Sequence, residues 1–444
     1  METSAGRIAP AIPGLRRAVV ASVIGNGLEW FDFLSYAYFA STIARVFFPL
    51  GNHTASLLLT LGVFAAGFVV RPIGGVLLGL YADRAGRKSA LTLLIGLMAV
   101  GTLLIALTPG YATIGLAAPA LVILARIIQG LSVGGEFGSA AAMLTEYAPP
   151  GQRMFYGSFQ MASQGVALLL ASGFGYVLTT TLDAQALQDW GWRIPFLFGA
   201  LIGPVGFYIR HNVGESPEFL AAQAARAATL DRAPRERLSI ASVLCGIGVI
   251  AVGTALNYLW HSYAPTYVVE QLHLPISAAL GGSTVAGLIA IMAYPASGWL
   301  ADRVGAFRLF FPVVTAFALA AYPLYAYVAA APSVGRLFTA QIVSTLFLSL
   351  MSGPHPGMLA GLFPTATRST GIALSYNIAV TLFGGLAPVT VTWLIAVTGN
   401  AMMPAYYQIM AAALSLVLVA ATLSPRSVYA RGAAYSTSST STRP

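Results

Sequence analysis

Five ionisable residues lie in stretches of this sequence that are otherwise apolar: Glu29, Asp32, Arg71, Arg126 and Glu136. An ionised side chain at the centre of a lone membrane helix costs about 2.5–3.5 kcal/mol, so such residues are usually paired or functional. The set holds three acids and two bases. Pairing alone would favour equal numbers, and burial favours the neutral form of a carboxylate. We therefore expect one spare carboxylate that can take up a proton.

The composition indicates a polytopic membrane protein. Hydrophobic residues make up 57% of the 444 residues and charged residues only 8%, with a mean hydropathy of +0.77. A soluble domain carries about 25% charged residues. The net charge of +9 comes from basic residues scattered singly, which argues against nucleic-acid binding. The lone Cys245 cannot form an intramolecular disulfide.

Apolar stretches long enough to cross a bilayer recur along the chain, since about 20 helical residues span roughly 30 Å of hydrocarbon. We predict an all-α protein with twelve transmembrane helices in two six-helix bundles. The expected helices cover 18–47, 55–82, 89–108, 115–147, 154–180, 192–210, 239–268, 276–301, 307–331, 335–361, 368–398 and 403–424. The expected units are an N-terminal segment (1–17), a first bundle (18–210), a central loop (211–238), a second bundle (239–424) and a disordered tail (425–444).

Basic residues predict the orientation, because Lys and Arg stay on the cytoplasmic side. With the N-terminus inside, only Arg45, Arg193 and Arg336 fall on the outer side, and the other loop and terminal basic residues lie inside. We therefore expect both termini, the central loop and the tail to be cytoplasmic.

A loop motif occurs at the same place in each half of the chain. GLYADRAGRK runs from Gly79 to Lys88, and GWLADRVGAFR runs from Gly298 to Arg308. The glycines permit a tight turn. We predict that the carboxylates of Asp83 and Asp302 lie at the start of a neighbouring helix, where the helix dipole favours negative charge.

This motif is similar to the loop signature of the major facilitator superfamily. The resemblance covers almost the whole chain and extends to the metabolite:proton symporter family, which includes citrate, alpha-ketoglutarate, shikimate and proline/betaine carriers. It implies proton-coupled uptake across a bacterial inner membrane. Among these carriers, GTLLIALTPGYATIGLAAPALVILAR most resembles those for citrate and other tricarboxylates. The stretches that carry the family resemblance include GNGLEWFDFLSYAYFA, RPIGGVLLGLYADRAGRK, RIIQGLSVGGEFGSAAAMLTEYAPPGQRMFYGSFQMASQG, WGWRIPF, ESPEF and GPHPGMLAGLFPTATRSTGIALSYN.

Two departures from the family pattern affect a predicted cytoplasmic gate. Ala306 and Phe307 replace the basic pair of the first loop, and Gly361 stands where relatives commonly have Glu. The gate is therefore expected to be lopsided. Its predicted members are Gly79, Asp83, Arg84, Gly86, Arg87, Glu146, Arg153, Asp302, Arg303 and Arg368.

The depth of a residue in the membrane can be estimated by counting from the inner surface at about 1.5 Å per helical residue. Glu29, Arg71 and Glu136 fall near the middle of the bilayer, with Asp32 and Arg126 further out. We expect Arg126 to attract a substrate carboxylate and Arg71 to form an intramembrane ion pair. Glu29, Asp32 and Glu136 are the candidates for proton coupling.

Other polar residues in the apolar stretches are candidates to complete the substrate site. Each has a structural alternative: a buried Gln can bridge two helices, a buried His can be purely structural, and the Gly353–Gly357 sequence GPHPG can be only a gating kink. The candidates are Asn26, Tyr36, Gln160, Gln164, Tyr258, His261, His355, Tyr376 and Asn377.

We therefore expect a monomeric secondary transporter that uses alternating access to take up a small organic anion, such as citrate, with protons. Sodium coupling, a shikimate cargo and a zwitterionic osmolyte such as betaine or proline remain open, and a non-transporting sensor is a remote alternative. No enzyme, metal or cofactor is expected, because a Walker loop, a His-Glu-x-x-His motif and a cysteine cluster are missing. The glycines Gly130, Gly134, Gly135 and Gly138 are attributed to close helix packing.

Overall fold

The computed structural model describes residues 15–85, 87–211, 238–364 and 367–423. Within these ranges the backbone alone is described at 15–24, 79–80, 82–85, 87–92, 201–202 and 205–211. Nearly all described residues are helical, and no strand occurs among them. The predicted segments 1–17, 211–238 and 425–444 fall largely or wholly outside the described residues.

The first half of the chain forms a set of long helices joined by short ones at the turns. In order, these are α1 (Leu15–Tyr38), α2 (Ala40–Phe47), α3 (His53–Val69), α4 (Arg71–Ala85), α5 (Arg87–Leu107), α6 (Tyr111–Ile114), α7 (Ala117–Val133), α8 (Glu136–Glu146), α9 (Arg153–Thr181), α10 (Ala184–Asp189), the 3-10 turn η1 (Gly191–Arg193) and α11 (Ile194–His211).

The second half is built in the same way, with two π-helical turns inside its long helices. In order, these are α13 (Ile240–Asn257), the π turn η2 (Tyr258–Ser262), α14 (Ala264–Leu272), α15 (Ile276–Val304), α16 (Ala306–Ala330), α17 (Val334–Ser352), α18 (His355–Leu362), α19 (Arg368–Val380), the π turn η3 (Thr381–Gly385), α20 (Ala387–Thr398) and α21 (Met403–Thr422).

Nine helices of the described part are long and apolar enough to cross a membrane. The expected segments 18–47, 89–108 and 192–210 form helices α1, α5 and α11 but are not among the nine. The number twelve therefore stays a prediction. The nine spans are His53–Leu78, Ala117–Glu146, Arg153–Thr181, Ile240–Ser262, Ile276–Val304, Ala306–Ala330, Val334–Leu362, Arg368–Thr398 and Met403–Thr422.

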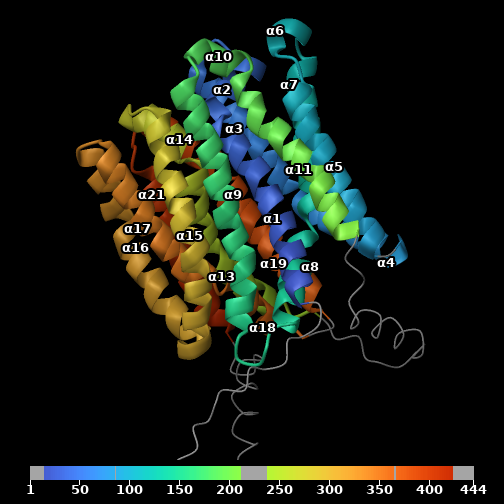
Figure 1. The fold of residues 1–444 in the computed structure, drawn as a ribbon. Coiled ribbons are helices and arrows are strands. Elements are labelled where there is room, and N and C mark those ends of the chain that lie inside the picture. The colour runs from blue at the N-terminus through green and yellow to red at the C-terminus, as the bar shows by residue number, and fades with distance from the viewer. Residues whose placement is uncertain (1–14, 86, 212–237, 365–366, 424–444) are drawn as a thin grey trace, which may run out of the picture.

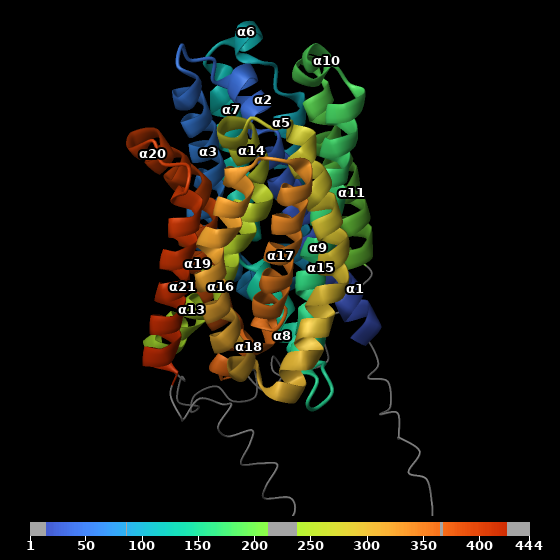
Figure 2. The same ribbon diagram turned by 90° about the vertical axis from the view of Figure 1, so that its left-hand side faces the viewer.

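The long helices run side by side in one elongated bundle (Figure 1). Helices α2, α6, α10 and α14 lie at one end, here named the α10 end, and α18 lies at the other, the α18 end. Figure 2 shows that α1 begins and α21 finishes at the α18 end. The halves meet mainly where α9 packs along α15, with further contacts of α8 and α9 against α18 and α19.

The predicted charge bias appears in this arrangement. Arg153, Arg303 and Arg368 lie at helix ends on the α18 side, and Arg45 and Arg193 lie in elements on the α10 side (Figure 1). The α18 end therefore corresponds to the side predicted to face the cytoplasm.

Glycines allow α7 to approach its neighbours closely. A Cβ atom at Gly130 would collide with the carbonyl oxygen of Gly67, and one at Gly134 would collide with that of Arg71. A Cβ atom at Gly138 would lie 2.5 Å from the carbonyl oxygen of Ser369 in α19. Close packing thus explains these three glycines. It does not explain Gly135, where an added Cβ would meet nothing within 4 Å.

This contrast yields a matched pair of variants. We expect Gly134→Ala to destabilise the protein by about 1–3 kcal/mol, because the methyl group forces the helix backbones apart. Gly135→Ala should leave stability nearly unchanged. Thermal unfolding of the purified variants in detergent measures the difference, and equal unfolding temperatures would contradict the packing argument.

Candidate functional site

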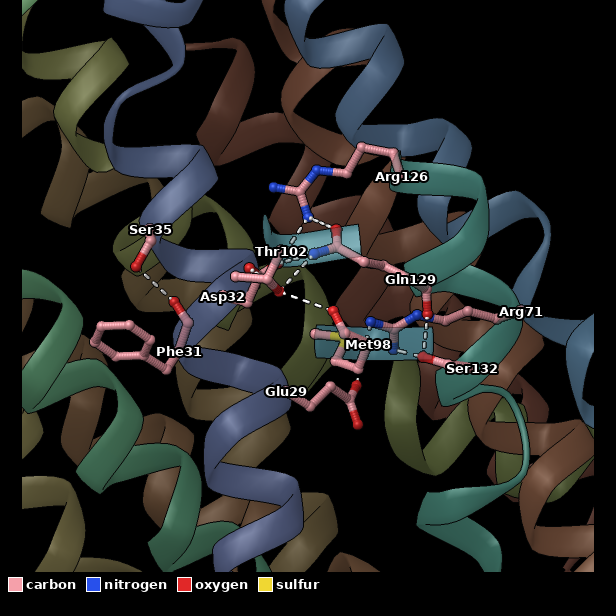
Figure 3. A network of polar contacts seen from close by, with 10 residues as sticks. All are labelled: Glu29, Phe31, Asp32, Ser35, Arg71, Met98, Thr102, Arg126, Gln129 and Ser132. Carbon is pink, nitrogen blue, oxygen red and sulfur yellow. Dashed lines mark hydrogen bonds and ion pairs between the residues drawn. The ribbon is translucent and has the colours of Figure 1, made fainter. Parts of the chain in front are cut away.

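Two buried ion pairs are stacked along α1 in the first half of the chain (Figure 3). Arg71 Nη2 lies 3.3 Å from Glu29 Oε1, and Arg126 Nη1 lies 3.2 Å from Asp32 Oδ2. The four side chains are between 0% and 7% exposed. The acids come from one face of α1, while the bases come from the first residue of α4 and the middle of α7.

The Asp32 carboxylate is held by further hydrogen bonds. Thr102 Oγ1 and Gln129 Nε2 each donate to it at 2.8 Å. Gln129 Oε1 in turn accepts from Arg126 Nη1 at 2.8 Å. The Arg126 guanidinium also lies 3.8 Å from the centre of the Tyr36 ring. This network pairs both charges within one half of the molecule, while Arg126 Nε and Nη2 have no hydrogen-bond partner among the described residues. The sequence pattern did not point to Thr102 or Gln129.

Aromatic rings surround the Arg71 guanidinium. The Arg71 guanidinium lies 4.1 Å from the centre of the Phe68 ring and 4.5 Å from that of Phe33. Arg71 Nε and Nη1 have no hydrogen-bond partner among the described residues. The ring faces therefore take the place of hydrogen-bond acceptors around part of this cation.

The third acid is placed differently from the other two. Glu136 is the first residue of α8, directly after the turn that separates α7 from α8, and it is partly exposed. It does not belong to either ion pair along α1. The predicted layer of Glu29, Arg71 and Glu136 is therefore observed as a Glu29–Arg71 pair with Glu136 at a helix start.

A narrow central cavity lies between the two halves and consists of two adjoining hollows. The cavity volume is about 10 Å³ in the first hollow and 20 Å³ in the second, about the space for one water molecule in each. Both hollows share five lining residues: Trp30, Gln164, Asn257, Tyr294 and Leu348. The first hollow is completed mainly by Leu34, Leu168, His261 and Thr345, and the second by Met161, Thr254, Tyr258, Ser352, His355 and Tyr376.

The lining of this cavity is mostly apolar, with a few polar groups and no charged side chain. Among the residues that border either hollow there is no Asp, Glu, Lys or Arg. Five of the predicted substrate-binding residues do border it. These are Gln164, Tyr258, His261, His355 and Tyr376.

The other five predicted binding residues fasten helices to one another outside this lining. Asn26 donates to Ser163 Oγ at 2.7 Å and to the carbonyl oxygen of Gln160 at 3.0 Å. Tyr36 donates to the carbonyl oxygen of Thr60 at 3.3 Å. Asn377 donates to the carbonyl oxygen of Gly134, and Arg126 pairs with Asp32. Their roles in substrate binding stay predictions.

Two π turns meet beside the second hollow. The turn η2 carries Tyr258 and His261, and the turn η3 contains Gly384. A Cβ atom at Gly384 would lie 2.8 Å from Tyr258 Cε2, so this glycine makes room for the ring. Such turns are common at functional sites. Nothing in the sequence pattern predicted them.

The predicted break before His355 is present. Helix α17 ends at Ser352 and α18 starts at His355, with Gly353 and Pro354 between them. On the facing helix, a Cβ atom at Gly253 would lie 3.0 Å from His355 Cε1 and would collide with Ser352 Oγ. Gly253 therefore allows His355 to lie close against α13.

Contacts between the halves close the cavity at the α18 end. Arg368 Nη1 lies 2.7 Å from Glu146 Oε1. Asp302 Oδ1 accepts from the Met154 backbone N–H at 3.0 Å, and Asp302 Oδ2 accepts from that of Phe155 at 2.9 Å. The carboxylate of Asp302 thus lies at the start of α9, the helix-start position predicted for it.

The remaining predicted gate residues contribute differently. Arg153 is exposed, and Arg303 is also exposed, with its guanidinium stacked 3.8 Å from the centre of the Trp299 ring. Five predicted gate residues lie outside the part of the chain whose side chains are described: Gly79, Asp83, Arg84, Gly86 and Arg87.

A second tie closes the α10 end, and the sequence analysis missed it. His53 Nε2, at the start of α3, lies 2.9 Å from Glu270 Oε1 in α14. Helix α3 also packs against η3 and α20. With both ends tied and lining residues such as Trp30, His261 and Tyr294 buried, this structure is an occluded arrangement.

Comparison with known proteins identifies the family. A citrate-proton symporter of Salmonella typhi is 36% identical over 410 residues, covering 91% of this chain and 93% of the relative. An alpha-ketoglutarate permease of Escherichia coli is 37% identical, with 83% and 85% covered. A proline/betaine transporter of Salmonella typhimurium is 32% identical, with 91% and 82% covered.

The chain belongs to the major facilitator superfamily. Within it, the chain is a member of the metabolite:proton symporter family. The sugar (and other) transporter family model matches residues 17–237. A solved D-xylose-proton symporter shares the fold, with a TM-score of 0.71 at 20% identity over 90% of this chain and 97% of the other. The family consequently makes this chain a multi-pass membrane transporter.

The Asp32 network gives a stability prediction for this family member. We expect Asp32→Asn to destabilise the protein by about 3–5 kcal/mol, because it leaves the buried Arg126 cation without its counter-charge. The double variant with Arg126→Gln removes both charges and should recover much of that loss. Unfolding temperatures of the three purified proteins test this, and a double variant less stable than Asp32→Asn would refute it.

Proposed function

We propose that this chain is a proton-coupled symporter that takes up a small organic acid anion, most plausibly a tri- or dicarboxylate such as citrate, by alternating access. The observation that carries the proposal is the central cavity, which both halves line and which inter-half ties close at each end. The resemblance to a citrate-proton symporter and an alpha-ketoglutarate permease supports the substrate class.

The ties at the two ends explain how access could alternate. The α10 end is held by the partly exposed His53–Glu270 pair, and the α18 end by Glu146–Arg368 and by Asp302 on α9. Exposed ion pairs contribute only about 0–1 kcal/mol. Either end can therefore open at low cost while the other stays closed, which is the requirement of a carrier with a site between two halves.

Proton coupling follows from charge balance. An organic anion adds negative charge to a cavity whose described lining has no cation. A co-transported proton lowers the cost of carrying that charge through a medium of low dielectric constant. Glu29, Asp32 and Glu136 remain the proposed proton carriers among the acids, although the first two are held in ion pairs.

The proposal also covers the orientation of the protein, its membrane and its oligomeric state. The charge bias supports a cytoplasmic α18 end, with both termini inside, in a bacterial inner membrane. We propose twelve transmembrane helices and a monomer, with lipid and the substrate as partners and without a cofactor.

A zwitterionic osmolyte such as betaine or proline is the second candidate cargo. Four aromatic residues border the cavity: Trp30, Tyr258, Tyr294 and Tyr376. Aromatic faces attract quaternary ammonium groups, and a proline/betaine transporter is among the relatives. Shikimate, sodium coupling and a sensor without transport complete the alternatives.

Uptake into proteoliposomes decides between these cargoes. The purified protein is offered citrate, tricarballylate, alpha-ketoglutarate, shikimate or betaine, with a proton gradient or a sodium gradient imposed separately. We expect accumulation of a di- or tricarboxylate that depends on the proton gradient. Accumulation of betaine alone, or binding without uptake, would overturn the proposal.

The ion pairs at the two ends also predict which end of the cavity opens more readily when one of them is removed. We expect Arg368→Gln to favour opening at the α18 end and Glu270→Gln to favour opening at the α10 end, each by a factor of up to about five. An impermeant thiol reagent applied from one side reports on Ser352→Cys in the cavity, after Cys245→Ala. Equal effects of both variants from the same side would contradict the assignment of the ends.

A further inference from the structure

Each hollow of the central cavity contains one histidine. His261 borders the first hollow and His355 borders the second. Their exposures are 0% and 3%, so neither belongs to the protein surface. They come from different elements, η2 and the start of α18.

One buried ring nitrogen of each histidine has no hydrogen-bond partner among the described residues. His261 Nε2 lies 3.3 Å from Thr345 Oγ1, while its Nδ1 has no hydrogen-bond partner among the described residues. His355 Nε2 likewise has no partner there. Burying such a group without a hydrogen bond is costly. These positions are therefore prepared for a ligand that supplies an acceptor or a proton.

The surroundings of both imidazoles are neutral at ordinary pH. Tyr294 borders both hollows, and Tyr258 and Tyr376 border the second. The net-neutral Glu29–Arg71 pair lies close to the second hollow, since both of its members interact electrostatically with Tyr258 and Tyr376, and the Asp32–Arg126 pair lies further along α1. Arg71 contacts the Phe68 ring, which packs edge-on against Tyr258 at 5.5 Å. Among the residues that border the cavity, only the two imidazoles can become cations.

We propose that His261 and His355 are the carboxylate-recognition groups of the cavity, one in each hollow, and that each binds a substrate carboxylate together with a proton. This inference rests on the proposed function and deepens it. It names a di- or tricarboxylate as the ligand and moves the coupling protons from the buried acids to the cavity itself.

The shared lining makes one ligand able to reach both histidines. The hollows adjoin at Trp30, Gln164 and Asn257, so a ligand that fills both after the cavity widens can contact both histidines. The side-chain amides of Gln164 and Asn257 can donate to a hydroxyl group or a central carboxylate. The narrow closed cavity must widen at one end before such a ligand enters.

The protons taken up and released balance over one transport cycle. Each imidazole takes one proton from the entry side, and each imidazolium donates a hydrogen bond to one carboxylate. On the exit side, loss of the carboxylate removes the stabilising charge, and each proton returns to water. Two protons then accompany each substrate molecule, with no oxidant or further reactant.

Glutamine variants test the recognition groups, because Gln retains a neutral donor but cannot become a cation. His261→Gln and His355→Gln are compared with His273→Gln, a change at the exposed C-cap of α14. Citrate uptake and protons moved per citrate are measured in proteoliposomes. We expect each cavity variant to raise KM for citrate roughly 10-fold or more and to remove one proton per citrate. The control should match the wild type.

Proton uptake by the wild type provides a measurement that does not depend on the folding of variants. Citrate is added to the detergent-purified protein, and calorimetry in buffers of different ionisation enthalpy counts the protons taken up. At a pH where free imidazole is neutral, we expect about two protons to be taken up for each citrate bound.

The outcomes separate this inference from the proposed function. If the wild type transports citrate but the cavity variants keep its KM and proton count, the histidine assignment is wrong while the symporter proposal stands. If the wild type binds citrate without taking up protons, the assignment is wrong as well. If it transports none of the carboxylates, both proposals fail.

Discussion

The burial of charge within the first half of the chain is the constraint on which the rest of the structure depends. In hydrocarbon, Arg71 and Arg126 can exist only where acids and aromatic faces replace water. Glu29 and Asp32 supply the acids from one face of α1, and Phe33, Tyr36 and Phe68 supply the rings. This fixes α1 against α4 and α7. The two halves differ in that these buried ion pairs belong to the first half, while the cavity lining of both halves has no Asp, Glu, Lys or Arg.

Much of the architecture was predictable from the sequence because the bilayer imposes long apolar segments and a charge bias on it. The repeated loop motif correctly placed Asp302 at the start of a neighbouring helix. The break before His355 followed from Pro354 and Pro356, which have no backbone N–H to donate within a helix. The family assignment is confirmed by the relatives.

The site was less predictable, because periodicity tells which face of a helix is polar but not what that face meets. Asn26, Gln160 and Asn377 have side chains typical of ligand contacts. In this structure they hold neighbouring helices together, and their roles in binding stay predictions. Trp30, Tyr294 and Ser352 border the cavity but resemble ordinary packing residues in the sequence. The His53–Glu270 tie joins parts distant along the chain, and the π turns are short irregularities within long helices. No local pattern encodes them.

The two hydrogen bonds from α9 to Asp302 link the closed state to the integrity of a helix end. When the halves separate there, the N–H groups of Met154 and Phe155 lose their carboxylate, and the first turn of α9 presents positive partial charge to water. Opening therefore exposes the N–H groups that were bonded to Asp302, and the start of α9 becomes an electropositive part of the protein surface.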